Sequence, residues 1–182
     1  MKFKTKEDLA RFAIDYYFVH QRLPKVAADE VAKDLYPKAA CFVSVYIDGN
    51  LRGCIGDYEV FEPLYLNIIK NSIRAAFSDF RFPQIEKKEL SRLQVEVSVL
   101  TVPVEYKQKN TDHFLKFLEQ RKPGVILEKE SQRALYLPQV WEKLPKPADF
   151  LSQLCLKASL PSSSWKGKEV KYWIFYLDSL HS

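Results

Sequence analysis

A thiol, a guanidinium and two glycines stand within five consecutive positions of this chain, in the segment Arg52-Gly53-Cys54-Ile55-Gly56. A thiol becomes nucleophilic when a nearby cation stabilises its thiolate, and Arg52 lies two positions from Cys54 on the same face of a regular strand. The chain has only five glycines. Gly53 and Gly56 therefore indicate backbone held at positive φ or brought close to another group. The segment predicts either a reactive thiol or a structural cysteine that lines a ligand site.

Asp79 and Arg81 form a second group of candidate residues, just after a predicted helix. Arg81 could bond the terminal carbonyls of that helix, and Asp79 could pair with an arginine such as Arg52. The alternative is a structural corner held by polar contacts.

Glu96 is a third candidate, because it stands between Val95 and Val97 on a strand that we expect to be central in its sheet. If it is buried, it needs a partner such as Arg52 or Arg81, and a raised pKa would suit it to proton transfer. If it faces solvent, it needs no partner.

Several common site motifs are missing from the sequence. The three histidines are far apart, there is no Cys-x-x-Cys pair, and there are no glycine-rich nucleotide loops and no serine-hydrolase elbow. We therefore predict no metal and no cofactor. The three cysteines, Cys41, Cys54 and Cys155, are odd in number and widely spaced, so we expect reduced thiols.

Length and composition predict a folded protein with a sizeable core. The chain has 182 residues, of which 47% are hydrophobic, and this fits one domain or two closely packed subdomains. The net charge of +5 comes from interspersed residues without a basic block, which argues against a nucleic-acid partner. The longest apolar stretch, near 39–47, is too short to span a bilayer, and the first residues lack the apolar run of a signal peptide. We expect a cytoplasmic protein without a membrane partner.

The pattern of the first half predicts a hairpin between two helices. A helix capped by Thr5 runs to Leu23, and a strand over 41–47 leads into an Asp48-Gly49 turn of type I′ that sets Ile47 opposite Asn50. In this register Cys54 lies opposite Val43 and on the same face as Cys41. A helix follows from Pro63 to about Ser78, and a strand covers 94–106, with Pro103 ending its ladder.

The second half repeats this order of elements. A helix over 111–121, a hairpin of 125–127 with 134–137, a helix from Pro147 and a strand over 170–177 are expected. The fold class is therefore α+β, with mainly antiparallel sheet and a hypothetical duplication of a helix, hairpin, helix, strand unit. Different strand orders in the two halves would contradict the duplication.

Taken together, several segments resemble the AMMECR domain family, named for a human chromosomal-region syndrome. The segments that carry the resemblance are Leu51–Gly56, Asp79–Pro83, Glu89-Leu90, Glu96–Leu100, Leu137–Val140 and Leu154–Ala158. The resemblance implies a single domain over residues 1–182, made of two unequal, intimately packed subdomains. Family members occur beside or fused to Memo-like proteins and beside radical S-adenosylmethionine enzymes, which implies an accessory role with such a partner.

The resemblance also carries over a set of candidate site residues by position. They are Arg52, Gly53, Cys54, Gly56, Asp79, Arg81, Glu96, Gln139 and Lys157. Three positions depart from the family pattern. The turn Arg121–Gly124 lacks a histidine that many members have there, which weakens a cysteine-histidine mechanism. Phe80 stands where proline is common, and Ser159 where glycine is common.

Three functions follow from these features. The first is a binding or accessory module with a polar cleft around Arg52–Gly56, which holds a small polar or anionic ligand or a partner's peptide. The second is a cysteine-dependent enzyme, in which Cys54 is nucleophile or redox thiol, Arg52 lowers its pKa and Glu96 transfers protons. The third is nucleic-acid binding.

Overall fold

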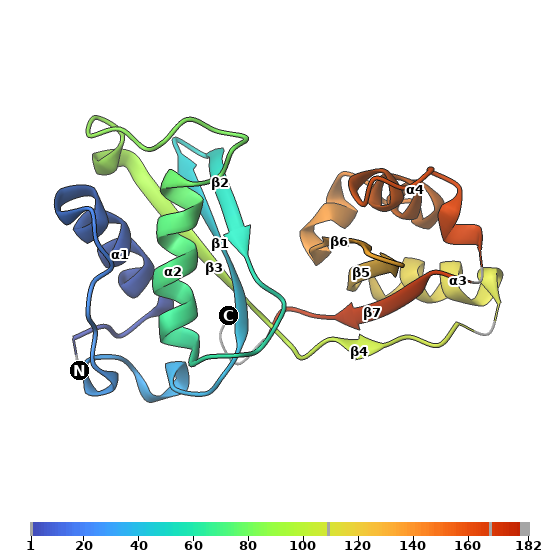
Figure 1. Ribbon diagram of the computed structural model, residues 1–182, viewed down its shortest axis with the longest axis horizontal. Helices are drawn as coiled ribbons and strands as arrows, with labels where there is room; N and C mark the ends of the chain where they lie inside the picture. The colour runs from blue at the N-terminus through green and yellow to red at the C-terminus, as the bar shows by residue number, and fades with distance from the viewer. Residues whose placement is uncertain (1, 109, 168, 179–182) are drawn as a thin grey trace. The chain divides into compact units, whose positions relative to one another are not determined.

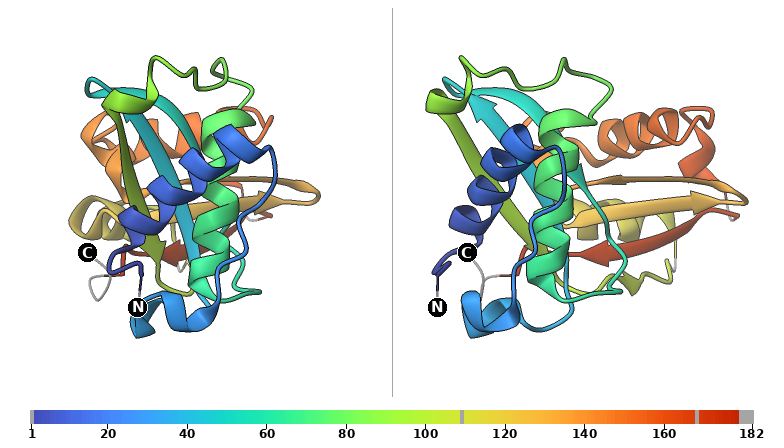
Figure 2. Two further views of the ribbon diagram at one scale, coloured as in Figure 1. Left: turned by 90° about the vertical axis from the view of Figure 1, so that its left-hand side faces the viewer. Right: turned by 60° about the vertical axis from the view of Figure 1, so that its left-hand side comes forward.

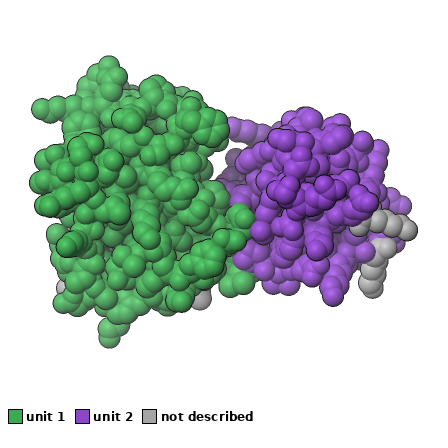
Figure 3. Space-filling model, viewed as in Figure 1, with its two compact units in different colours: residues 1–102, 178–182 green, residues 103–177 purple. Residues whose placement is uncertain are grey.

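The computed structural model describes residues 2–108, 110–167 and 169–178. The chain divides into two compact units, unit 1 with residues 1–102 and 178–182 and unit 2 with residues 103–177 (Figure 3). None of the helices among the described residues is long and apolar enough to cross a membrane.

Unit 1 is a three-stranded antiparallel sheet with two helices on one face (Figures 1 and 2). Its elements are α1 (Lys6–His20), β1 (Ala40–Ile47), β2 (Asn50–Gly56), α2 (Leu64–Phe77) and β3 (Leu93–Leu100), with short 3-10 turns at Ala28–Glu30, Lys33–Leu35 and Leu90–Arg92. The strand order is β2-β1-β3. Val43 and Val45 of β1 pack with Ile68 of α2 in a core that also includes Leu9 of α1. The opposite face of the sheet carries none of the helices of unit 1.

Local signals set the ends of these elements. Thr5 accepts a hydrogen bond from the Asp8 N–H at 3.0 Å and begins α1, as predicted. The helix ends at His20 rather than at Leu23, because Gln21 takes a left-handed conformation with φ of 51°. Helix α2 lies where the sequence predicts it, directly after Pro63.

The hairpin of β1 and β2 has the predicted turn but a different register. Asp48 and Gly49 both have positive φ, and Ile47 pairs with Asn50, as in a type I′ turn. A β-bulge then leaves Arg52 without a cross-strand partner, so that Cys54 pairs with Ser44 and not with Val43 as predicted. The one-residue shift moves Cys54 to the face opposite the helices.

Strand β3 lies at an edge of the sheet, since β1 is the central strand. The prediction that Glu96 lies on a central strand is therefore wrong. The segment predicted as one strand over 94–106 forms two strands in different sheets, β3 and β4 (Val104–Glu105). Pro103 separates them, because it has no N–H to donate to a ladder.

Unit 2 has the same order of elements as unit 1, with β4 added at one edge. It contains α3 (Thr111–Arg121), β5 (Gly124–Lys129), β6 (Gln132–Tyr136), α4 (Pro147–Lys157) and β7 (Lys171–Phe175), with 3-10 turns at Pro138–Glu142 and Ser164–Lys166. The antiparallel sheet has the order β4-β7-β5-β6 (Figure 1). In each unit the first hairpin strand lies between the second hairpin strand and the final strand. The strand orders therefore agree with the predicted duplication.

Gly53 and Gly56 allow close approach of backbone rather than positive φ. A Cβ atom on Gly53 would lie 2.0 Å from the Ala75 carbonyl oxygen of α2, and one on Gly56 would lie 2.4 Å from the Cys41 carbonyl oxygen. Neither glycine has positive φ, unlike Gly49 with φ of 78°. The two glycines fix β2 against α2 and β1.

We expect Gly53→Ala to destabilise the protein strongly, because the added methyl group meets rigid helix backbone. The free energy of unfolding should fall by about 3 kcal/mol or more, as measured by urea denaturation. Gly49→Asn is the control in the same hairpin, since a Cβ atom at Gly49 would meet nothing within 4 Å and asparagine tolerates positive φ. Equal stability of the two variants would contradict the close-approach role of Gly53.

Candidate functional site

Asp79 joins the loop after α2 to the backbone of Cys54. Its buried carboxylate accepts the Cys54 N–H at 2.9 Å and the Arg81 guanidinium at 2.9 and 2.6 Å. Arg81 in turn donates from Nη2 to the Cys54 carbonyl oxygen at 2.8 Å. The predicted pairing of Asp79 with Arg52 is wrong, because its partner is Arg81. Both backbone polar groups of Cys54 are thus held by side chains at the open edge of β2.

The hydrogen bonds keep Asp79 ionised. Those from the Arg81 guanidinium are the main cause, and with the Cys54 N–H they lower the pKa of Asp79 to about 2, against the opposing effect of burial. The same pairing raises the pKa of Arg81. Asp79 is therefore a structural anion at neutral pH and not a general base.

Arg52 anchors the next part of the same loop. Its guanidinium binds the Glu89 carboxylate at 2.9 and 3.0 Å and the Pro83 carbonyl oxygen at 2.6 Å. Burial by itself raises the pKa of Glu89, but the Glu86 N–H and Arg52 hold it below its ordinary value. The predicted role of Arg52 in lowering the pKa of Cys54 has no support from these contacts. Glu89 was missed as a site residue, although its segment belongs to the family pattern.

Cys54 lies in a row of polar side chains on the helix-free face of the sheet. Ser44 pairs with Cys54 on one side and with Glu96 on the other, and the Ser44 hydroxyl donates to Cys54 Sγ at 3.3 Å. Adjacent strands are about 4.8 Å apart, so the ends of this row are about 10 Å apart. We call Cys54, Ser44 and Glu96 the polar row. Ser44 could have been found from its alternation with Val43 and Val45.

Tyr46 extends the polar contacts of the row. Its hydroxyl donates to Glu96 Oε2 at 3.4 Å. Burial is the main cause that raises the pKa of Tyr46, and the Glu96 charge adds to it. Sequence reasoning missed Tyr46 as well, although it alternates on the same strand.

Glu96 is exposed and pairs with neither arginine of the site. Of the two alternatives left open for Glu96, the structure shows the one that faces solvent, and the guanidiniums of Arg52 and Arg81 bind Glu89 and Asp79 instead. Its role in proton transfer stays a prediction.

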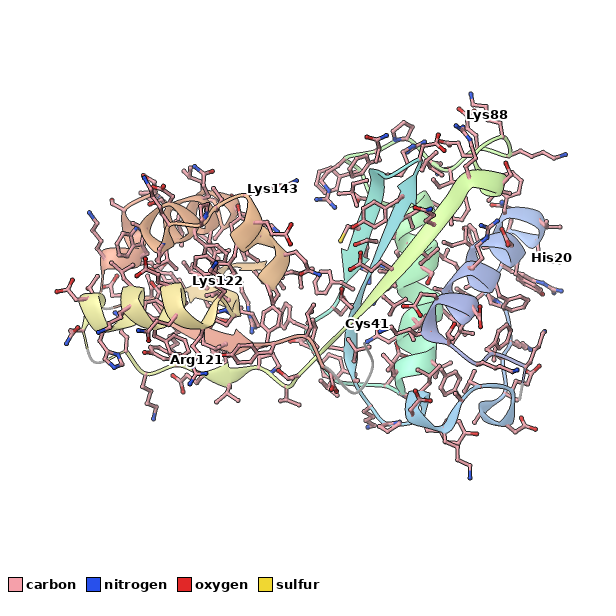
Figure 4. The ribbon with its side chains drawn as sticks, turned by 180° about the vertical axis from the view of Figure 1, so that it is seen from behind. His20, Cys41, Lys88, Arg121, Lys122 and Lys143 are labelled. Atoms are coloured by element: carbon pink, nitrogen blue, oxygen red, sulfur yellow. The ribbon has the colours of Figure 1, made fainter. Side chains whose placement is uncertain are left out.

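The three thiols differ in their access to water. Cys41 (labelled in Figure 4) and Cys155 are fully buried, and burial raises the pKa of both, that of Cys41 to about 12. Cys54 is partly exposed. It is therefore the thiol that a reagent or a ligand can reach.

Gln139 and Lys157 belong to unit 2. Gln139 lies in the 3-10 turn Pro138–Glu142, and Lys157 is the last residue of α4. The Lys157 ammonium donates to the Leu135 carbonyl oxygen at 2.9 Å and lies over the Tyr136 ring. Their participation in the site of Cys54 stays a prediction.

The duplicated topology offers an internal comparison for the polar row. Ser44 lies three residues before the end of β1, and Ile126 holds the same place in β5. Ile126 pairs with Leu135 and with Trp173, while its neighbours Val125 and Leu127 face the helical core. The equivalent row of unit 2 is thus wholly apolar. The fold does not require polar residues at these positions.

We expect Asp79→Asn to destabilise the protein by about 2 kcal/mol at neutral pH, since it removes a carboxylate whose pKa folding depresses. That stabilisation is present above about pH 4 and is lost as the pH falls through about 2. Urea denaturation at several pH values should therefore show a smaller loss of stability in acid for the variant. Asp29→Asn, at an exposed position of the same unit, is the control. An unchanged acid profile for Asp79→Asn would contradict the assignment.

Comparisons with known proteins agree with the fold and the motifs. The AMMECR1 family model matches residues 7–179. Relatives include a protein of Aquifex aeolicus, 38% identical over 73% of this chain and 68% of its own length, and Protein TV1384 of Thermoplasma volcanium, 39% identical over 90% and 81%. The solved structure of the uncharacterized protein PH0010 from Pyrococcus horikoshii is 31% identical, with a TM-score of 0.83 over 94% of this chain and 86% of that one. The chain belongs to the AMMECR1 family.

Proposed function

We propose that this protein is a binding or accessory module and that the polar row of unit 1 is its recognition surface. The observation that carries the proposal is the contrast between the two units. At the same topological positions, unit 1 has Cys54, Ser44 and Glu96, and unit 2 has an apolar row centred on Ile126. Ile126 is fully buried, whereas Glu96 is exposed and Cys54 is partly exposed, so the polar row of unit 1 presents its groups to solvent and to a ligand.

The surroundings of Cys54 support recognition, because they hold the row in one geometry. Gly53 packs against α2, and Asp79 and Arg81 bind both backbone polar groups of Cys54. A surface that is ordered before binding loses little conformational entropy when a ligand arrives. Hydroxyl, thiol and carboxylate groups in one line suit a polar ligand or an extended peptide segment.

The family resemblance suggests a setting for this function. We propose a cytoplasmic accessory role beside a Memo-like protein or a radical S-adenosylmethionine enzyme, with a small polar ligand, or a segment of the partner, on the polar row. A ligand-binding role of Gln139 and Lys157 is proposed from the family resemblance alone.

Nuclear magnetic resonance of the isotope-labelled chain tests the surface. During titration with mixtures of amino acids, nucleotides and sugar phosphates, we expect shifts that concentrate at Ser44, Cys54 and Glu96. Ser44→Val, which introduces the apolar chemistry of unit 2, should weaken that response about ten-fold, because the row loses its central hydroxyl as a hydrogen-bonding group. The exposed Ser131→Ala in the turn of unit 2 is the control. Shifts that avoid the row, or that survive Ser44→Val unchanged, would refute this recognition surface.

Cysteine chemistry is the second candidate function, and the exposure of Cys54 favours it. Arg81 is held beside Cys54, and the charge of a Cys54 thiolate interacts with that guanidinium. We propose that the Ser44 hydroxyl at Cys54 Sγ and the Glu96 carboxylate on the same face of the sheet take part in proton transfer to and from the thiol.

Alkylation by iodoacetamide separates the two candidates. With the folded protein at neutral pH we expect Cys54 alone to react, at a rate no higher than that of glutathione, and Cys41 and Cys155 to react only after unfolding. Peptide mass spectrometry over a time course gives all three rates. A Cys54 rate well above that of glutathione would show an activated thiolate and favour the enzyme.

A further inference from the structure

The charges around the polar row do not balance. Arg52 binds Glu89, and Arg81 binds Asp79, so that each guanidinium at the site is neutralised by a carboxylate. Glu96 takes part in no ion pair among the described residues of the chain, and its contact there is the Tyr46 hydroxyl. The row therefore carries the negative charge of Glu96 at one end and the Cys54 thiol at the other.

We infer that the ligand of the polar row carries a cationic group, such as a primary ammonium, which pairs with Glu96 while another part of the ligand lies against Cys54. This inference rests on the proposed recognition surface and names its ligand class. A cation favours the Glu96 end, because an uncompensated carboxylate attracts it and no arginine competes. An anionic group would gain less binding free energy at this row, because the guanidiniums of Arg52 and Arg81 already bind carboxylates.

The geometry limits the size of this ligand. Two strand spacings, about 10 Å, separate the backbones of Cys54 and Glu96, and the two side chains point from the same face. The Tyr46 hydroxyl lies 3.4 Å from Glu96 Oε2, on the side of the carboxylate toward β1. A chain of two or three carbons between the sulfur contact and the ammonium fits this span.

Charged thiol reagents of matched length test the inference. Aminoethyl and sulfonatoethyl methanethiosulfonate each transfer a thioalkyl group to Cys54. The thiolate attacks the sulfenyl sulfur, a disulfide forms, methanesulfinate leaves, and the thiol proton passes to solvent. Rates are measured by mass spectrometry on the full chain, in the wild type and in Glu96→Gln, with the exposed Asp29→Asn as the control of equal charge change.

We expect the ratio of the aminoethyl rate to the sulfonatoethyl rate to fall about five-fold in Glu96→Gln at low ionic strength, and the effect to shrink in high salt. Asp29→Asn should leave the ratio unchanged. The aminoethyl-labelled wild type should also melt a few degrees above the sulfonatoethyl-labelled one, and this difference should vanish in Glu96→Gln.

The outcomes separate this inference from the proposed function. If Cys54 reacts with neither reagent, the row is closed to ligands and both proposals fail. If Cys54 reacts but Glu96→Gln changes neither the rate ratio nor the melting difference, the cationic ligand class is overturned while the recognition surface stands.

Discussion

Asp79 places an ionised carboxylate, almost wholly removed from water, against the open edge of β2. A buried charge needs partners, and here the Cys54 N–H and the Arg81 guanidinium supply them. Because Arg81 also binds the Cys54 carbonyl oxygen, the loop satisfies the backbone groups that a further strand would otherwise pair. The position of the thiol therefore depends on a carboxylate 25 residues later in the chain.

The β-bulge at Arg52 gives the segment its second constraint. In a regular ladder, Cys54 would face the helical core beside Val43. The extra residue moves Cys54 to the helix-free face and releases Arg52 to bind Glu89. Gly53 then faces α2, where only a residue without a side chain fits. Arg52 and Gly53 therefore act to position the Cys54 thiol rather than to change its reactivity.

Two sheets of the same strand order within one chain show which features belong to the topology. Both units have a two-residue hairpin and a final strand that pairs with its first strand. Among the residues that the structure describes, the bulge and the polar row occur in unit 1 and not in unit 2. The apolar row of unit 2 shows that the polar row is a property of unit 1 and not of the architecture.

The sequence by itself determined most of the elements, the type I′ turn and the repeated order of elements in the two halves, because hydrophobic periodicity, helix caps and the positions of glycine and proline act over a few residues. It also indicated that Cys54, Asp79 and Arg81 belong together. Only the tertiary structure decided the register of Cys54, the edge position of β3 and the pairing of Arg52 with Glu89. The bulge at Arg52 and its ion pair with Glu89 depend on groups that are far apart in the chain. Their contribution to the free energy of folding arises only when the strands and the loop are packed together.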